Sequence, residues 1–411
     1  MNNASRLRRR ICLGLGMGLA SNLAWAGGLG RAFGSAGEAV EDVGGVRYTT
    51  VHDFAGLAGP EADSGILLAS DGNGYAVTGR GGTRNLGTIY RITPGKDVKV
   101  LHSFGGKRQG DGNYPVAPLI EVGGALYGVT SEGGSTNGGV AFRLAHDTGY
   151  TVLHDFGVTP GDASLCWGGL LFASDGHFYG ASYYGGTNNR GLVYRMDMAG
   201  TVTPVWHLGA AGAPAFPLAA VIERADGRLY GTTRGGGALG HGTIYSVAKD
   251  GSDLQVVFSF NGLNGSSPQV PLLETADGGL YGVTTIGGTH GRGTAYRLAP
   301  GGVHTVLHSF TGGEDGREPN TELLMVEPGV FMGTTTFGGG GGLGSGVAYV
   351  VHDDGTYRRL HRFGGTVHGK PDGAWPTGAL CRAAGGQVVG VCRIGGANGQ
   401  GTIWKMTPVP A

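Results

Sequence analysis

Residues 119–156 read LIEVGGALYGVTSEGGSTNGGVAFRLAHDTGYTVLHDF, and this stretch decides the fold. It contains four short apolar or β-branched runs separated by glycine-rich segments, a pattern that predicts successive antiparallel hairpins. We expect strands over 119–122, 125–130, 140–144 and 150–156. The Gly123-Gly124 pair between the first two runs supplies the positive φ angles that a tight hairpin turn needs. The stretch is therefore predicted to be one four-stranded antiparallel unit.

This unit recurs along the chain with a period of about 52 residues (for example 156 − 104 = 52). Three anchors repeat in a fixed order: a motif that usually ends in an aromatic residue, a tyrosine-glycine step such as LYGVT at Tyr127, and a glycine leading into an aromatic, such as GTIY at Tyr90. The first anchor ends at Phe54, Phe104, Phe156, Leu208, Phe260, Phe310 and Phe363. Repeats of this length indicate a propeller or a solenoid and not independent domains.

The seven repeats predict an all-β fold, a seven-bladed β-propeller of four-stranded antiparallel blades spanning residues 47–408 as one domain. The chain opens with a lone outer-type strand over 47–54 and closes with only three strands of its last blade. We therefore expect the N-terminal strand to complete the seventh blade and close the ring. A helical solenoid does not fit, because the repeats show no helical periodicity. Residues 27–46 are expected to be a flexible segment, and 409–411 a short tail.

The first 26 residues are typical of an export signal peptide. Arg6, Arg8, Arg9 and Arg10 form a basic start, residues 11–23 form an apolar core, and Ala24-Trp25-Ala26 offers a small-x-small cleavage site. The apolar stretch is short and rich in glycine for a membrane span. We expect a secreted or periplasmic protein that begins at Gly27, without a membrane anchor.

Composition excludes several classes of function. Glycine accounts for 88 of 411 residues without a three-residue period, which excludes collagen. Lys+Arg and Asp+Glu are both 30, so bulk charge gives no reason to expect a nucleic-acid partner. The chain has no P-loop, dinucleotide fingerprint, GxSxG or HExxH motif and no zinc-type cysteine spacing. We expect no cofactor and no metal, and a monomer.

Three cysteines follow the predicted cleavage site. Cys381 and Cys392 flank a Gly-Gly hairpin, so their side chains could lie nearly opposite on paired strands. A disulfide in an oxidising compartment and two buried free thiols both fit this spacing. Cys166 has no evident partner and is expected to be buried.

The run LYGTT…GG…GTIYRL…LHSF…GG.DG..P resembles the GloVer-type extracellular tandem repeat, named for Gloeobacter and Verrucomicrobia. The resemblance covers residues 47–408, and it implies export and a propeller-like architecture without a settled biochemical activity. Members of the family often end in a surface-sorting segment. This chain stops at Ala411, soon after its last predicted strand, so we expect a free and not an anchored protein.

In a propeller, the loops between second and third strands emerge on the same face as the loops that lead from one blade to the next. Both sets are long and polar here, which makes this loop face the expected ligand surface. Residues that break the repeat are the better candidates. Before the inner-strand proline stand Asp63, Tyr114, Cys166, Phe216, Ser267, Glu318 and Trp375, with Trp167 taken to occupy the proline place of its blade. These aromatics and acids either stack and hydrogen-bond a sugar or plug the channel mouth.

Basic and phenolic residues on the same face suggest chemistry. Arg234, Arg393 and Arg80 suit a carboxylate or sulfate, although exposed arginine is also ordinary surface. His241, His290, Arg292, Tyr183 and Tyr184 could form a His/Tyr/Arg site that abstracts a proton beside a uronate carboxylate. Asp63 and Glu318 are the conceivable carboxylate pair of a hydrolase. The periodic histidines, by contrast, are interpreted as structural: His52, His102, His154, His308 and His361.

Two functions follow from the sequence. The first is an exported propeller that binds a carbohydrate or another extracellular ligand on its loop face. The second is a polysaccharide-active enzyme, most plausibly a uronate-polysaccharide lyase.

Overall fold

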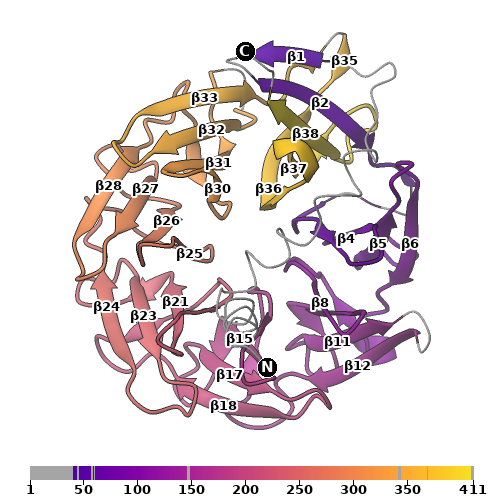
Figure 1. Cartoon of the computed structure of the whole chain (residues 1–411). Coiled ribbons are helices and arrows are strands. Elements are labelled where there is room, and N and C mark those ends of the chain that lie inside the picture. The colour runs from indigo at the N-terminus through magenta and orange to yellow at the C-terminus, as the bar shows by residue number, and fades with distance from the viewer. Residues whose placement is uncertain are drawn as a thin grey trace, which may run out of the picture.

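The computed structural model describes residues 40–43, 46–56, 59, 61–145, 149–340, 344–367 and 369–408. The predicted signal peptide and the tail at 409–411 lie outside these residues. Antiparallel sheets stand around a central axis like the blades of a wheel (Figure 1). The predicted seven-bladed β-propeller of four-stranded blades is confirmed.

Each blade is a meander that runs outward from the axis. Blade 1 comprises β3 (Leu67–Leu68), β4 (Gly74–Thr78), β5 (Thr88–Ile92) and β6 (Val98–Ser103). Blade 2 comprises β8 (Ile120–Val122), β9 (Ala125–Val129), β11 (Val140–Ala145) and β12 (Gly149–Asp155). Blade 3 comprises β14 (Leu171–Phe172), β15 (Phe178–Ser182), β17 (Leu192–Met196) and β18 (Val202–His207). Blade 4 comprises β20 (Ile222–Glu223), β21 (Leu229–Thr233), β23 (Thr243–Val247) and β24 (Gln255–Ser259).

The remaining blades follow the same order. Blade 5 comprises β25 (Leu273–Glu274), β26 (Leu280–Thr284), β27 (Thr294–Leu298) and β28 (His304–Ser309). Blade 6 comprises β30 (Leu324–Glu327), β31 (Val330–Phe337), β32 (Val347–His352) and β33 (Tyr357–Arg362), with β29 (Arg317–Pro319) also paired to β31. Blade 7 comprises β36 (Gly373–Arg382), β37 (Val388–Gly395), β38 (Thr402–Pro408) and β2 (Val46–Asp53).

Short elements join the blades. Three two-stranded ribbons link a loop that enters a blade to the loop between second and third strands of that blade: β7 (Gly112–Asn113) with β10 (Glu132–Gly133), β13 (Ala163–Ser164) with β16 (Tyr184–Gly185), and β19 (Pro214–Ala215) with β22 (Gly235–Gly236). A fourth ribbon pairs β34 (Thr366–Val367) with β35 (Lys370–Pro371). Two 3₁₀ turns are η3 (Lys107–Gln109) and η4 (Ala384–Gly386).

The N-terminal strand closes the ring, as predicted. β2 lies against β38 in antiparallel register, from Val46 opposite Pro408 to Asp53 opposite Thr402 (Figure 1). Four residues of the segment 27–46 form a strand: β1 (Val40–Val43) pairs with the outer side of β2. The free edge of β2 offers unpaired backbone N–H and C=O groups, and a further strand satisfies them.

The tyrosine-glycine step has a steric cause. A Cβ atom at Gly231 would lie 2.6 Å from the hydroxyl oxygen of Tyr245 on the next strand, and one at Gly180 would lie 2.4 Å from the Tyr194 ring. The second anchor therefore lacks a side chain so that the aromatic ring of the third anchor can lie across it. Blade 1 carries Ala76 at this place.

The hydrophobic core lies between blades. The first anchor of one blade contacts the third anchor of the next: the rings of Phe104 and Phe142 are 5.5 Å apart, and those of Phe54 and Tyr90 are 5.4 Å apart. All four side chains are fully buried. The three repeated anchors are therefore a single packing unit that joins neighbouring blades, and Phe54 extends it across the point of closure.

The periodic histidines also join blades. His102 Nε2 lies 3.0 Å from Asp111 Oδ2, and the Tyr150 hydroxyl of the next blade donates to Asp111 Oδ1 at 2.6 Å. The rings of His102 and Tyr150 stack with their centres 3.7 Å apart. Tyr48, Asp372 and His361 repeat the arrangement where the ring closes. His154 pairs with Asp162 and His308 with Asp315 in the same way. The contacts of four of the five periodic histidines therefore agree with the structural interpretation. Asp111 and Asp372 do more than form turns, because they receive these side-chain hydrogen bonds.

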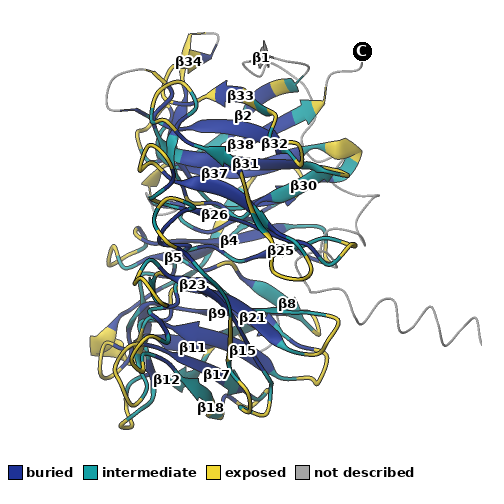
Figure 2. Cartoon of the chain, turned by 90° about the vertical axis from the view of Figure 1, so that its left-hand side faces the viewer, coloured by how far each residue is buried: buried dark blue, intermediate teal, exposed yellow. Residues whose placement is uncertain are grey.

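The two faces of the ring differ. The loops between second and third strands and the loops between blades meet on one face, where the short ribbons pair them. The opposite face carries the Asp-Gly turns and the turns between third and fourth strands. Lys249, in one of the latter turns, forms an ion pair with Glu223 at the end of β20. In Figure 2 the strands are largely buried and the exposed residues gather in the loops at both faces.

Candidate functional site

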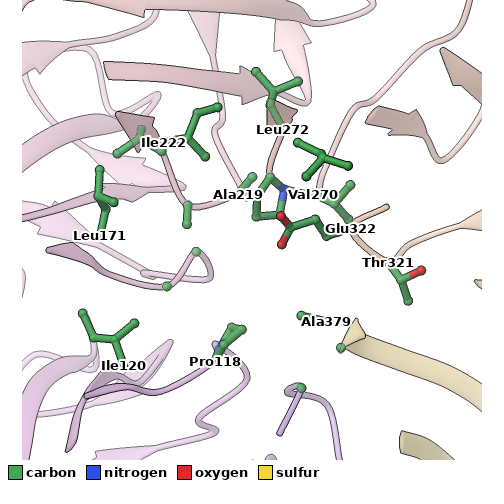
Figure 3. A pocket seen from close by; sticks show the side chains of 18 of the residues that line it. Pro118, Ile120, Leu171, Ala219, Ile222, Val270, Leu272, Thr321, Glu322 and Ala379 are labelled. Atoms are coloured by element: carbon green, nitrogen blue, oxygen red, sulfur yellow. The ribbon is translucent and has the colours of Figure 1, made fainter. Parts of the chain in front are cut away.

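A cavity of about 1830 Å³ runs along the propeller axis. Its lining includes Tyr114 and Arg234 from the loop face and Asp226 and Asp277 from the turns of the opposite face. The cavity therefore extends along the inner strands from one face towards the other. Between its ends the walls are mostly small and aliphatic, with Pro118, Ile120, Leu171 and Ile222 among the side chains that surround the open space in Figure 3.

Each blade begins on the loop face with one residue of positive φ, and two of these residues, Tyr114 and Leu165, line the cavity. These seven residues, here called the mouth ring, have φ between 54° and 68°: Glu61, Tyr114, Leu165, Phe216, Ser267, Glu318 and Trp375. None is glycine, and a left-handed conformation costs an ordinary L-residue about 1–2 kcal/mol. The surroundings hold it there by backbone bonds; the Tyr114 N–H donates to Leu86 O and its carbonyl accepts from the Ser131 N–H.

The mouth ring corrects the predicted alignment in two blades. Glu61 and Leu165 occupy the places that the sequence alone assigned to Asp63 and Cys166. Cys166 takes the proline place, so that Trp167 lies two residues beyond the ring, as Asp63 does in blade 1. In these two blades Ala62 and Cys166 follow the ring residue where the other blades have proline, and this absence of proline hid the register. The residues themselves still face the channel, because both Asp63 and Trp167 line the cavity.

A charged cluster at the mouth connects blades 7, 1 and 2. Arg393 Nη2 donates to Glu61 Oε2 at 2.8 Å and to the Tyr114 hydroxyl at 3.0 Å, and its Nε lies 3.4 Å from Asp63 Oδ1. Arg80 Nε binds the other oxygen of Glu61 at 3.0 Å. The sequence analysis identified Asp63, Arg80, Tyr114 and Arg393 as candidates. It missed Glu61, whose only sequence signal is its position before the first inner strand.

Asp63 is the unusual acid of this cluster. Burial raises its pKa to about 7, and the neighbouring Arg393 only partly opposes the rise. One of its carboxylate oxygens is buried without a hydrogen-bond partner among the described residues. A Cβ at Gly79 would lie 2.8 Å from that oxygen, so glycine leaves it the space it occupies.

Two aromatic groups flank the cluster. Trp167 is 38% exposed and contacts Tyr114 edge to face, with ring centres 6.0 Å apart. Tyr183 lies between Tyr184 and Phe216, with ring centres 4.7 and 5.2 Å away. Exposed aromatic faces beside fixed polar groups are the surfaces on which sugar rings stack.

Arg234 belongs to the second aromatic group. Its Nη1 donates to the Tyr183 hydroxyl at 3.1 Å, and both side chains line the cavity. The other two arginines of the lining are neutralised, Arg393 by Glu61 and Arg224 by Glu274. Among the described residues, Arg234 is thus the lining arginine that has no carboxylate partner.

The structure does not assemble the predicted His/Tyr/Arg site in full. Tyr183 and Arg234 are joined, but His241 pairs with Ser266 at 3.1 Å and His290 with Thr289 at 3.0 Å. Several other candidates also lie outside the described lining of the cavity: Arg292, Glu318 and Trp375. Trp375 packs on Phe337 instead, with ring centres 5.5 Å apart.

The cysteines are free thiols. Cys381 lies opposite Val389 and Cys392 opposite Pro376, because a register shift between Thr377 and Cys381 displaces the first cysteine along β36. Of the two alternatives that the sequence left open, the structure shows the two buried thiols and not the Cys381–Cys392 disulfide. Cys166 is also buried and free.

The described part of the chain holds no group of three or more His, Cys, Asp or Glu residues that could bind a metal ion. In the same residues, no helix is long and apolar enough to cross a membrane.

The repeat, the ring of blades and the loop-face mouth define a tandem-repeat β-propeller. The chain belongs to the Gloeobacter/Verrucomicrobia repeat family, whose model matches residues 40–170 and 150–345. This confirms the family resemblance seen in the sequence. A comparison with curated protein sequences found no match.

Solved structures share the fold. A streptogramin B lyase superposes with a TM-score of 0.59 at 13% identity, covering 88% of this chain and 97% of that one. An oligogalacturonate lyase from Vibrio parahaemolyticus gives 0.54 at 10% identity, covering 90% and 96%. An oligogalacturonate lyase in complex with manganese gives 0.54 at 14%, covering 91% and 96%. At these identities the likeness concerns the fold alone.

Proposed function

We propose that the protein is an exported propeller that binds a uronate-containing polysaccharide at the loop-face mouth of its channel. The observation that carries the proposal is Arg234, a lining arginine without a carboxylate partner among the described residues, held by Tyr183 beside exposed aromatic rings. A guanidinium group presents paired N–H donors that match a carboxylate. The uronate carboxylate is thereby the natural partner of Arg234.

The rest of the mouth supplies what a sugar ring needs. Trp167 and Tyr114 offer apolar faces, and the Arg393–Glu61 pair offers donors and acceptors that are already fixed in position. Fixed groups bind more tightly than flexible ones because less conformational entropy is lost on binding. Export is supported by the signal-like residues 1–26.

A uronate-polysaccharide lyase is the second candidate, and the contact between Arg234 and Tyr183 favours it. The arginine would neutralise the carboxylate of the substrate, and the phenol or Asp63, whose pKa is about 7, would move a proton. His241 and His290 hydrogen-bond to Ser266 and Thr289 on the loop face. The two imidazoles of the catalytic site that the sequence suggested are therefore not part of the contact between Arg234 and Tyr183. Binding without turnover is for this reason the first candidate.

The two functions are separated by one experiment. The purified protein is incubated with polygalacturonate, and with dextran as a neutral control, followed by size-exclusion chromatography and ultraviolet detection of unsaturated ends. Polygalacturonate that co-elutes with the protein at unchanged length supports binding. Shortened chains with unsaturated ends support the lyase. If neither polymer interacts, both candidates are wrong.

Variants assign the result to the mouth. Arg234→Gln and Trp167→Ala should each weaken retention of polygalacturonate about tenfold, the equivalent of about 1.4 kcal/mol. Leu263→Ala is the matched control, since Leu263 is 74% exposed and lies outside the described lining of the cavity. Equal retention by all three variants would place the binding surface elsewhere.

A further inference from the structure

Glu322 interrupts a ring of small uncharged residues inside the channel. It lies four residues beyond its mouth-ring residue, Glu318. The same offset in the other blades gives Gly65, Pro118, Gly169, Ala220, Pro271 and Ala379, and all of them line the cavity. One carboxylate therefore stands where six blades carry glycine, alanine or proline. Four residues of extended chain span at most about 13 Å, so this ring lies no more than that distance along the chain from the mouth ring.

The Glu322 carboxyl group points into the cavity, with Pro118 and Ile120 across the open space (Figure 3). No hydrogen bond or ion pair involves it among the described residues. The other acids of the lining all have partners, for example Glu121 with Ser70 at 2.5 Å, Glu274 with Arg224 at 2.7 Å and Asp277 with Arg297 at 2.6 Å. Partners also exist for Asp63, Glu223 and Asp226. Glu322 thus differs from the other acids of the lining in having no hydrogen-bond or ion-pair partner among the described residues.

The walls next to Glu322 are aliphatic. Two residues further along each inner strand the channel is lined by Leu67, Ile120, Leu171, Ile222, Leu273, Leu324 and Cys381. Burial among these groups raises the pKa of Glu322 to about 7, and no charged neighbour contributes to the rise. An ionised carboxylate in such surroundings is costly unless a positive charge meets it.

We infer that the channel holds a second binding site, separate from the mouth, in which Glu322 receives the ammonium group of a small aliphatic amine and the leucine and isoleucine side chains contact its alkyl chain. The site meets both requirements of such a ligand, one anion and an apolar wall. A divalent metal ion is a poorer match, since Ca²⁺ and Mg²⁺ take six or more oxygen ligands, and Glu322 supplies a single carboxylate.

The test is calorimetric titration of the purified protein with hexylammonium chloride at pH 8, where the carboxyl group is ionised and the amine remains protonated. Hexanol is the neutral probe of equal length, and magnesium chloride is the inorganic cation. Glu322→Gln keeps the size of the side chain and removes its charge. Glu327→Gln is the matched control, because Glu327 is an exposed acid at the end of β30, the inner strand that begins two residues after Glu322.

Hexylammonium should bind the wild type and Glu327→Gln with equal affinity, and Glu322→Gln at least about tenfold more weakly, the loss expected for a charge-assisted hydrogen bond. Hexanol should bind the wild type at least about tenfold more weakly than the amine does. Affinity for the amine should fall as the pH drops below 7. The inference is overturned if the wild type binds no amine, if Glu322→Gln binds it equally well, or if hexanol or magnesium binds as tightly.

Thermal unfolding of Glu322→Gln serves as the folding control. Because the substitution removes a charge that stands among aliphatic side chains, the variant should unfold at or above the wild-type temperature at pH 8. A folded Glu322→Gln variant that has lost amine affinity supports the site, and one that has kept it overturns the site.

Discussion

Replacing Tyr48 by phenylalanine would remove one hydroxyl group from the contact that closes the propeller. That hydroxyl donates to Asp372 Oδ1 at 2.5 Å, and the Tyr48 ring stacks on His361 at 3.8 Å. His361 Nε2 in turn lies 2.7 Å from Asp372 Oδ2. The phenyl ring would still fill its buried place, so the substitution isolates the hydrogen bond between the N-terminal strand β2 and the loop that enters blade 7.

The magnitude follows from the partners that remain. A hydrogen bond to a charged group contributes about 1.5–3 kcal/mol. Asp372 Oδ1 would still accept from the Gly373 N–H at 2.6 Å, so no buried acceptor is orphaned and the loss should be about 1.5–2 kcal/mol. The propeller over 47–408 has 362 residues (408 − 47 + 1). At about 2.1 cal/mol/K per residue, the unfolding entropy is about 0.76 kcal/mol/K, and Tm should fall by about 2–3 °C.

Differential scanning calorimetry at neutral pH measures this shift. Tyr150→Phe is the matched variant, because the Tyr150 hydroxyl donates to Asp111 in the same arrangement between blades 1 and 2. We expect the two variants to lose similar stability. A Tyr48→Phe protein that melts with the wild type, while Tyr150→Phe melts earlier, would refute the closure of the ring by the N-terminal strand.

Three further predictions follow from the same structure. Burial raises the pKa of Asp111, but hydrogen bonds from histidine, tyrosine and backbone groups outweigh this effect and hold the pKa below the ordinary 3.8. The contribution of Asp111 to stability is therefore complete above pH 3.8 and is lost as the pH falls through the lowered pKa. Acid titration of Asp111→Asn should accordingly show a shallower loss of stability than that of the wild type. Gly231→Ala places a Cβ 2.6 Å from the Tyr245 hydroxyl, and urea unfolding should reveal a loss of about 1–3 kcal/mol, whereas an unchanged midpoint would mean that the packing is looser than described. Cys381 and Cys392 should not react with maleimide in the folded protein, since burial raises the pKa of both thiols, and should react once the protein is denatured, with no reductant added. If they fail to react in the denatured protein, it contains the disulfide that the strand register excludes.

The fold was predictable because its packing repeats. The phenylalanine, glycine and aromatic anchors of each repeat are one contact set, so that their order in the sequence reports directly on the spacing of the blades. Ring closure was predictable for the same reason: the chain begins with the strand that its last repeat lacks. The strand β1 escaped prediction because an edge-covering strand needs backbone partners only, and the segment around Val40 belongs to no repeat.

The site was predictable only in part. The sequence singled out Tyr114, Trp167 and Arg234 because they depart from the repeat, and all three line the cavity. It placed Asp63 and Cys166 in the wrong register, because their blades lack the proline that follows the ring residue elsewhere and only the positive φ of Glu61 and Leu165 reveals the alignment. Convergence between blades depends on backbone geometry, which a repeat pattern does not contain.

Glu322 is a further residue that could not be identified from the sequence without the register of the blades. Its sequence signal was present, since an acid replaces a small residue at one channel position. Recognising that signal requires the register of all seven inner strands. Once the mouth ring supplies the register, the lone carboxylate stands out from its six equivalents.

The most direct test of the proposed function is a calorimetric titration of polygalacturonate fragments into the wild type and Trp167→Ala. Trp167 is 38% exposed, so the variant should fold normally and unfold at nearly the same temperature. We predict measurable binding by the wild type and about tenfold weaker binding by the variant, as expected when an aromatic stacking surface is lost. Absence of binding by the wild type, or equal affinity in both proteins, would contradict a polysaccharide site at the channel mouth.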